Sequence, residues 1–235
     1  GTATMQKAFR ESINRAACDT ELPGYFTRAD NYIPSGLTLR GESYREKRPG
    51  RYEFPYDPED ARKNLTDTAK AQKNKKIPSV TLLYADEPGM KEAASVVAQQ
   101  WQQNMGLYCN VEARSRQKLL AAVSSGDYQV ALVPFSAEDN TVQSFLKQFA
   151  SSGGRSSGFK STAYDNTLGQ MTGGKTTDEL YNLAAEAEQS LLQYNGITPI
   201  FYSSSVYALS PALLDVQVQA FGGKVDFAFA GKKES

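Results

Sequence analysis

Residues 79–135 read SVTLLYADEPGMKEAASVVAQQWQQNMGLYCNVEARSRQKLLAAVSSGDYQVALVPF, and the architecture that we expect follows from this stretch. Three short apolar segments, 79–85, 107–113 and 128–135, are typical of strands, and the segments between them have apolar residues at helical spacing. The order strand–helix–strand–helix–strand with short connections predicts a βαβαβ unit, whose strands are parallel and covered by helices. We therefore expect an α/β fold.

The two helices of this unit have clear signals. The first is expected to begin at Pro88 and to end at Gly106, which is a typical helix C-cap. Its apolar stripe consists of Met90, Ala94, Val97, Trp101 and Met105. The second helix is expected over 115–125, with Leu119, Leu120 and Val123 directed inward. We expect Trp101 to be mostly buried between helix and sheet.

The segments before the unit are less regular. Residues 4–17 have the spacing of one amphipathic helix. Residues 19–55 are rich in Gly, Pro, Asn and Tyr and show no sustained period, so we expect a long irregular segment that crosses the surface. Residues 58–72 are expected to form a helix with Asp57 as N-cap and Pro58 as its first residue.

The segments after the unit predict further helices and a strand. Thr176 and Glu179 form a capping-box pattern for the longest of these helices. The tail alternates polar and apolar residues around Gly222 and Gly223. The expected elements are short helices near 141–149 and 164–171, a long helix at 177–194, and an extended segment at 197–209.

Composition excludes several classes of function. The chain has 26 Lys plus Arg and 26 Asp plus Glu, so it lacks the concentration of basic charge that nucleic-acid binding requires. It has no histidine, which removes the commonest general base and metal ligand. With two cysteines, Cys18 and Cys109, and no CxxC, a metal site is not expected, and both are interpreted as free buried thiols. No cofactor is indicated.

Glu138 and Asp139 are adjacent acids just after the third strand of the unit. Ligands of open α/β sheets bind beyond the carboxyl ends of the strands, so the pair has a position suited to binding. Asp139 has an equally good alternative role, as the N-cap of the helix that follows. Glu138 is a poor cap and is therefore the better candidate, with simple solvent exposure as its alternative.

An enzyme is not expected. There is no nucleophile–base pair, and adjacent carboxylates do not flank a cleft from two elements as a glycosidase pair does. TGGK at 172–175 lacks the spacing of a phosphate-binding loop. We therefore name no catalytic residue.

Seven motifs in order resemble one family, the solute-binding proteins of oligopeptide and dipeptide ABC transporters (extracellular solute-binding protein family 5). The resemblance covers nearly the whole chain and is to the C-terminal half of the family. The motifs are MQKAFRESINRA, YDPEDARKNL, the strand–helix–strand from VTLLYADEPGM to NVE, GDYQVAL, GFKSTAYDNTLGQM, AEQSLLQYNGITPIFY and FGGKVDFAFAGK.

The resemblance implies the fold and the domain organisation. We expect a lobe of a type II periplasmic-binding-protein-like fold, with a mixed sheet and helices on it. Residues 1–214 would form the C-terminal lobe of a two-lobed protein whose first lobe lies outside this chain. Residues 215–235 would be a tail that rejoins that first lobe.

The resemblance also implies ligand-binding residues. In family members that hold extended peptides, the segment after the matching strand contributes an aromatic wall, backbone pairing and an acid for the peptide α-ammonium. In this chain those positions are Phe135, Ser136, Ala137 and Glu138, and Tyr202 is a fifth candidate. The sequence departs from the family by having Phe for Trp, Glu for Asp, and Pro134, which lacks a backbone donor.

The function implied is that of the substrate-binding component of an ABC importer, which binds extended peptides in a cleft between two lobes. The partners would be a peptide and the permease subunits, with no nucleic acid. The location would be extracytoplasmic, as a periplasmic or cell-surface lipoprotein whose lipid anchor lies outside this chain. The alternative is a surface sensing or interaction lobe for a non-peptide solute, such as a sugar or metal complex.

Overall fold

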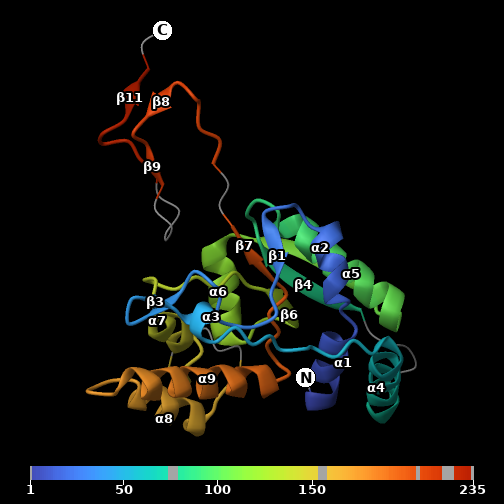
Figure 1. Cartoon of the computed structure of the whole chain (residues 1–235). Helices are drawn as coiled ribbons and strands as arrows, with labels where there is room; N and C mark the ends of the chain where they lie inside the picture. The colour runs from blue at the N-terminus through green and yellow to red at the C-terminus, as the bar shows by residue number, and fades with distance from the viewer. Residues whose placement is uncertain (1, 74–78, 153–157, 205–206, 219–224, 234–235) are drawn as a thin grey trace.

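The computed structural model describes residues 2–73, 79–152, 158–204, 207–218 and 225–233. The βαβαβ prediction is confirmed by three parallel strands in the order β5-β4-β6 (Figure 1). β4 pairs with β5 from Val80↔Cys109 to Ala85↔Arg114 and with β6 from Leu82↔Val130 to Tyr84↔Leu132. These strands are β4 (Val80–Ala85), β5 (Cys109–Arg114) and β6 (Val130–Leu132).

Two helices pack on this sheet, α5 (Met90–Met105) and α6 (Arg116–Ser125). All five residues of the predicted α5 stripe are buried. Trp101 is 3% exposed, and its indole N–H donates to the carbonyl oxygen of Phe9 at 3.1 Å. α5 begins two residues after the predicted Pro88, because Gly89 has a left-handed φ of 76°. The predicted C-cap, Gly106, is confirmed.

The single helix predicted over 4–17 is wrong. The chain forms α1 (Ala3–Glu11) and α2 (Arg15–Glu21) instead. Asn14 breaks the helix because its side chain accepts from the N–H groups of Ala16 and Ala17 and caps α2. By contrast, α4 (Pro58–Ala71) begins as predicted, with the Asp57 carboxylate accepting from the Asp60 N–H at 2.9 Å.

The segment 19–55 does not simply cross the surface, and this prediction is also corrected. Its apolar side chains are spaced irregularly, yet several belong to a buried cluster: Tyr32, Ile33, Leu37, Leu39 and Tyr44. The segment also contains short elements. They are β1 (Phe26–Arg28), β2 (Thr38–Leu39), β3 (Glu42–Ser43) and α3 (Tyr44–Lys47).

A second group of helices completes this cluster. The long helix α9 begins with the predicted capping box between Thr176 and Glu179. β7 forms only residues 201–203 of the predicted extended segment and pairs antiparallel with β1, beside the parallel sheet. These elements are α7 (Val142–Lys147), α8 (Thr162–Gln170), α9 (Thr177–Gln193) and β7 (Phe201–Ser203).

The last described residues form an arm that extends away from the rest of the chain (Figure 1). It consists of antiparallel pairs between β8 (Leu213–Leu214) and β11 (Gly231–Lys232), and between β9 (Gln217–Val218) and β10 (Val225–Asp226). The predicted turn at Gly222 and Gly223 lies outside the described residues. None of the helices within the described ranges is long and apolar enough to cross a membrane.

Candidate functional site

Phe135 and Ser136 follow the carboxyl end of β6, where the sequence placed them. The Phe135 ring packs on Phe149, with ring centroids 4.9 Å apart, and Phe149 in turn contacts Phe145 of α7. Phe135 is half-buried and Ser136 is exposed. The aromatic ring is therefore fixed by a core contact, while the next residue remains accessible.

Ala137 and Glu138 lead from this strand toward α7. Ala137 packs against the same cluster as Phe135, and the Glu138 N–H donates to the Ser144 hydroxyl at 3.0 Å. The Glu138 side chain is exposed, and among the described residues its carboxylate has no hydrogen bond or ion pair. The backbone at Glu138 is held in place while its charge is uncompensated.

Asp139 is not the N-cap of α7, which corrects one of the two roles considered for it. Thr141 is the cap, and its hydroxyl accepts from the Ser144 N–H at 3.2 Å. The Asp139 carboxylate accepts from the Thr141 N–H at 2.9 Å and from its hydroxyl at 2.5 Å. The hydrogen bonds from Thr141 lower the pKa of Asp139 below its usual value. Asp139 therefore has a local structural role.

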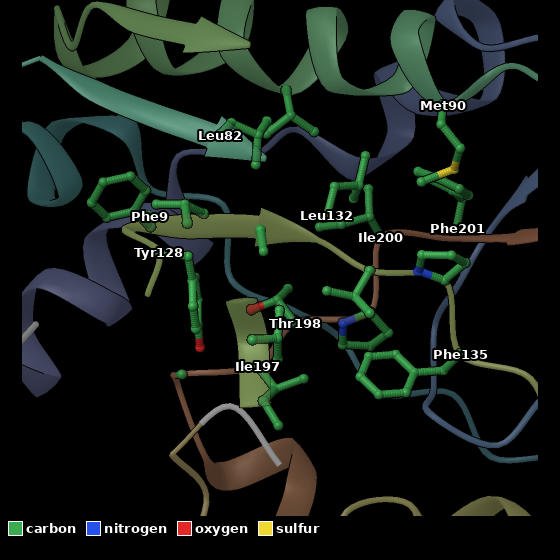
Figure 2. A pocket seen from close by; sticks show the side chains of 18 of the residues that line it. Phe9, Leu82, Met90, Tyr128, Leu132, Phe135, Ile197, Thr198, Ile200 and Phe201 are labelled. Carbon is green, nitrogen blue, oxygen red and sulfur yellow. The ribbon is translucent and has the colours of Figure 1, made fainter. Parts of the chain in front are cut away.

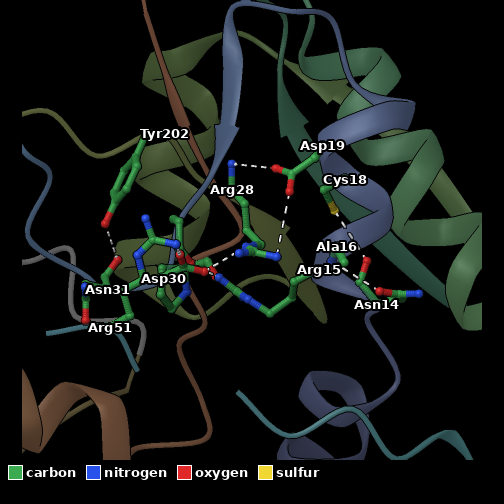
Figure 3. A network of polar contacts seen from close by, with 12 residues as sticks. Asn14, Arg15, Ala16, Cys18, Asp19, Arg28, Asp30, Asn31, Arg51 and Tyr202 are labelled. Atoms are coloured by element: carbon green, nitrogen blue, oxygen red, sulfur yellow. Dashed lines mark hydrogen bonds and ion pairs between the residues drawn. The ribbon is translucent and has the colours of Figure 1, made fainter. Parts of the chain in front are cut away.

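Tyr202 lies on β7, opposite Thr27 of β1. Its hydroxyl donates to the Asn31 carbonyl oxygen at 2.8 Å, and burial raises its pKa to about 12 (Figure 3). The ring is half-buried. The hydroxyl is thus engaged with the backbone, and the ring face is the part that could contact a ligand.

A large cavity brings three of the five candidates together. Its volume is about 1640 Å³, and Phe135, Ser136 and Tyr202 line it, whereas Ala137 and Glu138 do not. Figure 2 shows apolar side chains around it from β4, α5, β6 and the segment 197–201. The labelled lining residues are Phe9, Leu82, Met90, Tyr128, Leu132, Phe135, Ile197, Thr198, Ile200 and Phe201.

A buried arginine holds the segment that carries Tyr202. The Arg15 guanidinium donates to the carbonyl oxygens of Pro199 and Ala29 and lies 4.1 Å from the centre of the Phe54 ring. Burial lowers its pKa to about 10. Arg15 is drawn beside Arg28, whose guanidinium donates to Asp30 at 2.8 Å (Figure 3). These contacts connect α2, β1 and β7.

A buried carboxylate holds the neighbouring loop. Glu188 of α9 accepts from the backbone N–H groups of Tyr32 and Ile33, at 3.0 and 2.8 Å, and from Arg45. Burial raises the pKa of Glu188, against the opposing effect of Arg45. The Tyr32 hydroxyl then donates to the Ile197 carbonyl oxygen at 2.6 Å. This loop and the segment 197–202 are therefore fixed to each other.

The remaining polar groups offer no further site. Cys18 is buried and Cys109 is half-buried, and both are free thiols; full burial was expected for both, so the prediction for Cys109 is corrected. Burial raises the pKa of both thiols. Within the described ranges, no group of three or more Cys, Asp or Glu side chains could hold a metal ion.

Sequence inspection missed Arg15, Glu188 and the cavity. Arg15 and Glu188 lie in helical segments where charge normally indicates a solvent-facing side chain, so nothing in their local pattern distinguished them. The cavity depends on segments about 70 residues apart in the chain, β6 and 195–204. No local signal could have predicted it.

A sequence profile of the bacterial extracellular solute-binding proteins, family 5 (middle part), matches residues 3–157. The periplasmic oligopeptide-binding protein OppA of Salmonella typhimurium strain LT2 is 28% identical over 131 residues, which are 55% of this chain and 24% of that protein. OppA of Escherichia coli K12 is 26% identical over 136 residues, 57% of this chain and 25% of that protein.

Solved structures show the fold. The substrate-binding domain of an oligopeptide ABC transporter from Bacillus anthracis strain Ames superposes with a TM-score of 0.81 at 18% identity, over 99% of this chain and 46% of that one. Listeria monocytogenes OppA bound to peptide gives 0.79 at 20% identity, over 99% and 45%. The type II fold prediction is confirmed. The chain spans about a quarter of the curated relatives and slightly under half of these structures.

Proposed function

The chain belongs to the bacterial extracellular solute-binding proteins of family 5, and on this premise we propose that it forms one lobe of the peptide-binding component of an ABC importer. Residues 1–214 would be the C-terminal lobe, and residues 215–235 would return to a first lobe outside this chain. Extended peptides would be held in the cleft between the lobes. This proposal is supported by the family membership and by relatives whose names describe oligopeptide binding.

One observation carries the proposal at the level of the site. A fixed aromatic ring, Phe135, lies three residues before an exposed carboxylate without a partner among the described residues, Glu138. An extended peptide offers the complement, an α-ammonium for the carboxylate and apolar groups for the ring. Closing a second lobe would exclude water and strengthen this charge-assisted contact. Ser136 and Ala137 lie between them and offer backbone groups for pairing.

The arm supports the two-lobe arrangement. Large apolar side chains are exposed on it, and Phe229 is 78% exposed. Exposed apolar groups in such number are typical of an interaction surface. The first lobe is the proposed partner of these side chains: Tyr207, Leu209, Leu213, Leu214, Val218, Phe227 and Phe229.

The proposed partners are a peptide and the permease subunits of the importer. The family is described as extracellular, and we infer an extracytoplasmic location, either periplasmic or as a cell-surface lipoprotein. Any lipid anchor would lie outside this chain. Since a binding component releases its ligand intact, we expect no hydrolysis of bound peptide.

Mass spectrometry of ligands that co-purify with the full-length protein tests the proposal. The expected result is a mixture of peptides that leave the protein on mild denaturation and that rebind intact. Calorimetry with those peptides then measures the affinity. Recovery of a sugar or a metal complex in place of peptide, with no binding of the peptide pool, would contradict the proposal.

A further inference from the structure

β6 has a strand partner on only one edge. It pairs with β4 over three residues, and among the described strands none pairs with its opposite edge. Along a strand, alternate residues direct their N–H and C=O groups to opposite edges. About half of the backbone polar groups of β6 therefore lack a strand partner, beside a cavity with apolar walls.

The sequence of β6 is that of a central strand rather than an edge strand. Residues 130–135 read VALVPF, without a polar residue, a pattern typical of strands buried on both faces. The real edge, β5, reads CNVEAR and carries an ion pair between Glu112 and Arg114 at 2.6 Å. Charges of this kind protect natural sheet edges. The apolar composition of β6 is therefore unexplained by its place at the edge.

The burial of β6 agrees with this contrast. Val130, Ala131 and Leu132 are all only half-buried, whereas most of β4 is buried. The wall across the cavity, residues 195–200, is half-buried throughout. Both walls thus expose apolar side chains to the same space.

The size of the cavity favours a polypeptide occupant. Its volume of about 1640 Å³ exceeds the usual range for small-molecule pockets, about 300–1,000 Å³. It would hold on the order of 50 water molecules at the density of the liquid. Water would hydrate apolar walls poorly, and a small apolar ligand would leave the backbone groups of β6 unpaired.

We propose that a β-strand from the part of the same protein outside residues 1–235 pairs with the free edge of β6 and fills this cavity. A strand meets both requirements, because its backbone pairs with β6 and its side chains cover the walls. The inference rests on the proposed function in that it takes the chain as one lobe of a longer protein. Enough polypeptide is available in relatives, since this chain covers 46% of the Bacillus anthracis structure.

Such a strand would bind this lobe covalently and structurally to the rest of the protein. It would convert β6 from an edge into a central strand and extend the described sheet beyond three strands. It would also separate the cavity from the ligand cleft, so that Phe135 and Ser136 at its end, rather than its interior, would face the ligand.

Hydrogen exchange of the full-length, ligand-free protein, read residue by residue by mass spectrometry, tests the proposal. The N–H groups of residues 130–133 are expected to be protected without alternation, because both edges of β6 are paired. The matched internal control is β5, where residues 110–114 should alternate between protected and fast-exchanging N–H groups.

Alternating protection in β6 like that in β5 would overturn the proposal. Protection of the outer N–H groups only after peptide is added would also overturn it, because the peptide would then be the strand. The experiment is separate from the test of function. A protein that binds no peptide can still show an uninterrupted β6, and a peptide-binding protein can show an alternating one.

Discussion

The backbone N–H of Ile33 donates to the buried carboxylate of Glu188 at 2.8 Å, across 155 positions of sequence. Replacement of Glu188 by Ala removes the acceptor of two N–H groups and leaves Arg45 without its partner. Breaking a buried pair of this kind costs about 3–5 kcal/mol, so Glu188→Ala should lower the free energy of unfolding by that amount. Urea unfolding measures it. Gln189→Ala, at an exposed position of the same helix, should change it by less than about 0.5 kcal/mol. Equal effects would mean that Glu188 does not hold the loop.

Arg15→Lys tests whether the planar guanidinium is required. Lysine keeps the charge, but it cannot donate to the carbonyl oxygens of Ala29 and Pro199 while stacking on Phe54. We expect a loss of about 2–3 kcal/mol, since hydrogen bonds from charged groups are stronger than neutral ones. Chemical denaturation of Arg28→Lys, whose ion pairs are more exposed, is the control and should show less than about 1 kcal/mol. Two equal losses would contradict the role given to Arg15.

Two glycines with the same φ of 76°, Gly89 and Gly126, separate backbone strain from steric overlap. A Cβ at Gly126 meets nothing within 4 Å, whereas a Cβ at Gly89 would lie 2.6 Å from the ring of Phe26. Phe26 is buried and packs on Phe201, so it cannot move freely. Gly126→Ala should cost about 1 kcal/mol from the left-handed backbone. Gly89→Ala should cost about 1–3 kcal/mol more. Thermal unfolding of both variants measures the difference, and equal costs would show that Phe26 yields.

Stability at alkaline pH should depend on Tyr202. The pKa of its phenol is about 12 in the folded protein and about 10 in the unfolded chain, because burial disfavours the charged form. A raised folded pKa gives stabilisation that is complete below pH about 10 and is lost as the pH rises toward 12. The stability advantage of the wild type over Tyr202→Phe should therefore shrink through that range. Urea unfolding at several pH values measures it, with Tyr108→Phe, 64% exposed, as a control that should show no such trend. An advantage that is constant from pH about 9 to about 12 would contradict the assigned burial.

The parts of the fold set by local rules could be predicted from the sequence. The βαβαβ order followed from apolar periodicity, and the cap at Asp57 and the capping box at Thr176 followed from side chains three residues from their partners. The break at Asn14 was missed because Ile13 continues the apolar spacing while a single amide side chain begins a new helix. In that contest between periodicity and capping, the cap prevailed.

The candidate site was predictable only along one strand. Phe135 and Ser136 follow from β6, since residues after the carboxyl end of a strand are set by the strand itself. Their proximity to the cavity that Tyr202 also lines depends on the pairing of β1 with β7 and on buried charges at Arg15 and Glu188. These contacts join residues up to 184 positions apart, and local periodicity contains no information about them.

Glu138→Gln tests the ligand contact that the proposed function requires. The carboxylate is exposed and, within the described ranges, has no partner, so its loss should leave the stability of the protein nearly unchanged. In the full-length protein the substitution should weaken peptides with a free α-amino group by about tenfold or more, because a charge-assisted bond is lost. N-acetylated peptides should be affected little, since they offer no cation. Calorimetry with the two peptide series gives a thermodynamic cycle that isolates the charge pair.

Asp139→Asn is the matched control for that experiment. Asp139 accepts from the backbone and hydroxyl of Thr141, so its charge is engaged locally and its loss should lower stability slightly without changing peptide affinity. Equal losses for free and acetylated peptides in Glu138→Gln would mean that the carboxylate positions the loop rather than the ligand. A loss specific to free amines that occurs in Asp139→Asn instead would move the ammonium contact by one residue. Because the exposed Glu138 side chain and the engaged Asp139 side chain are adjacent, the two variants differ in contact chemistry and hardly at all in location.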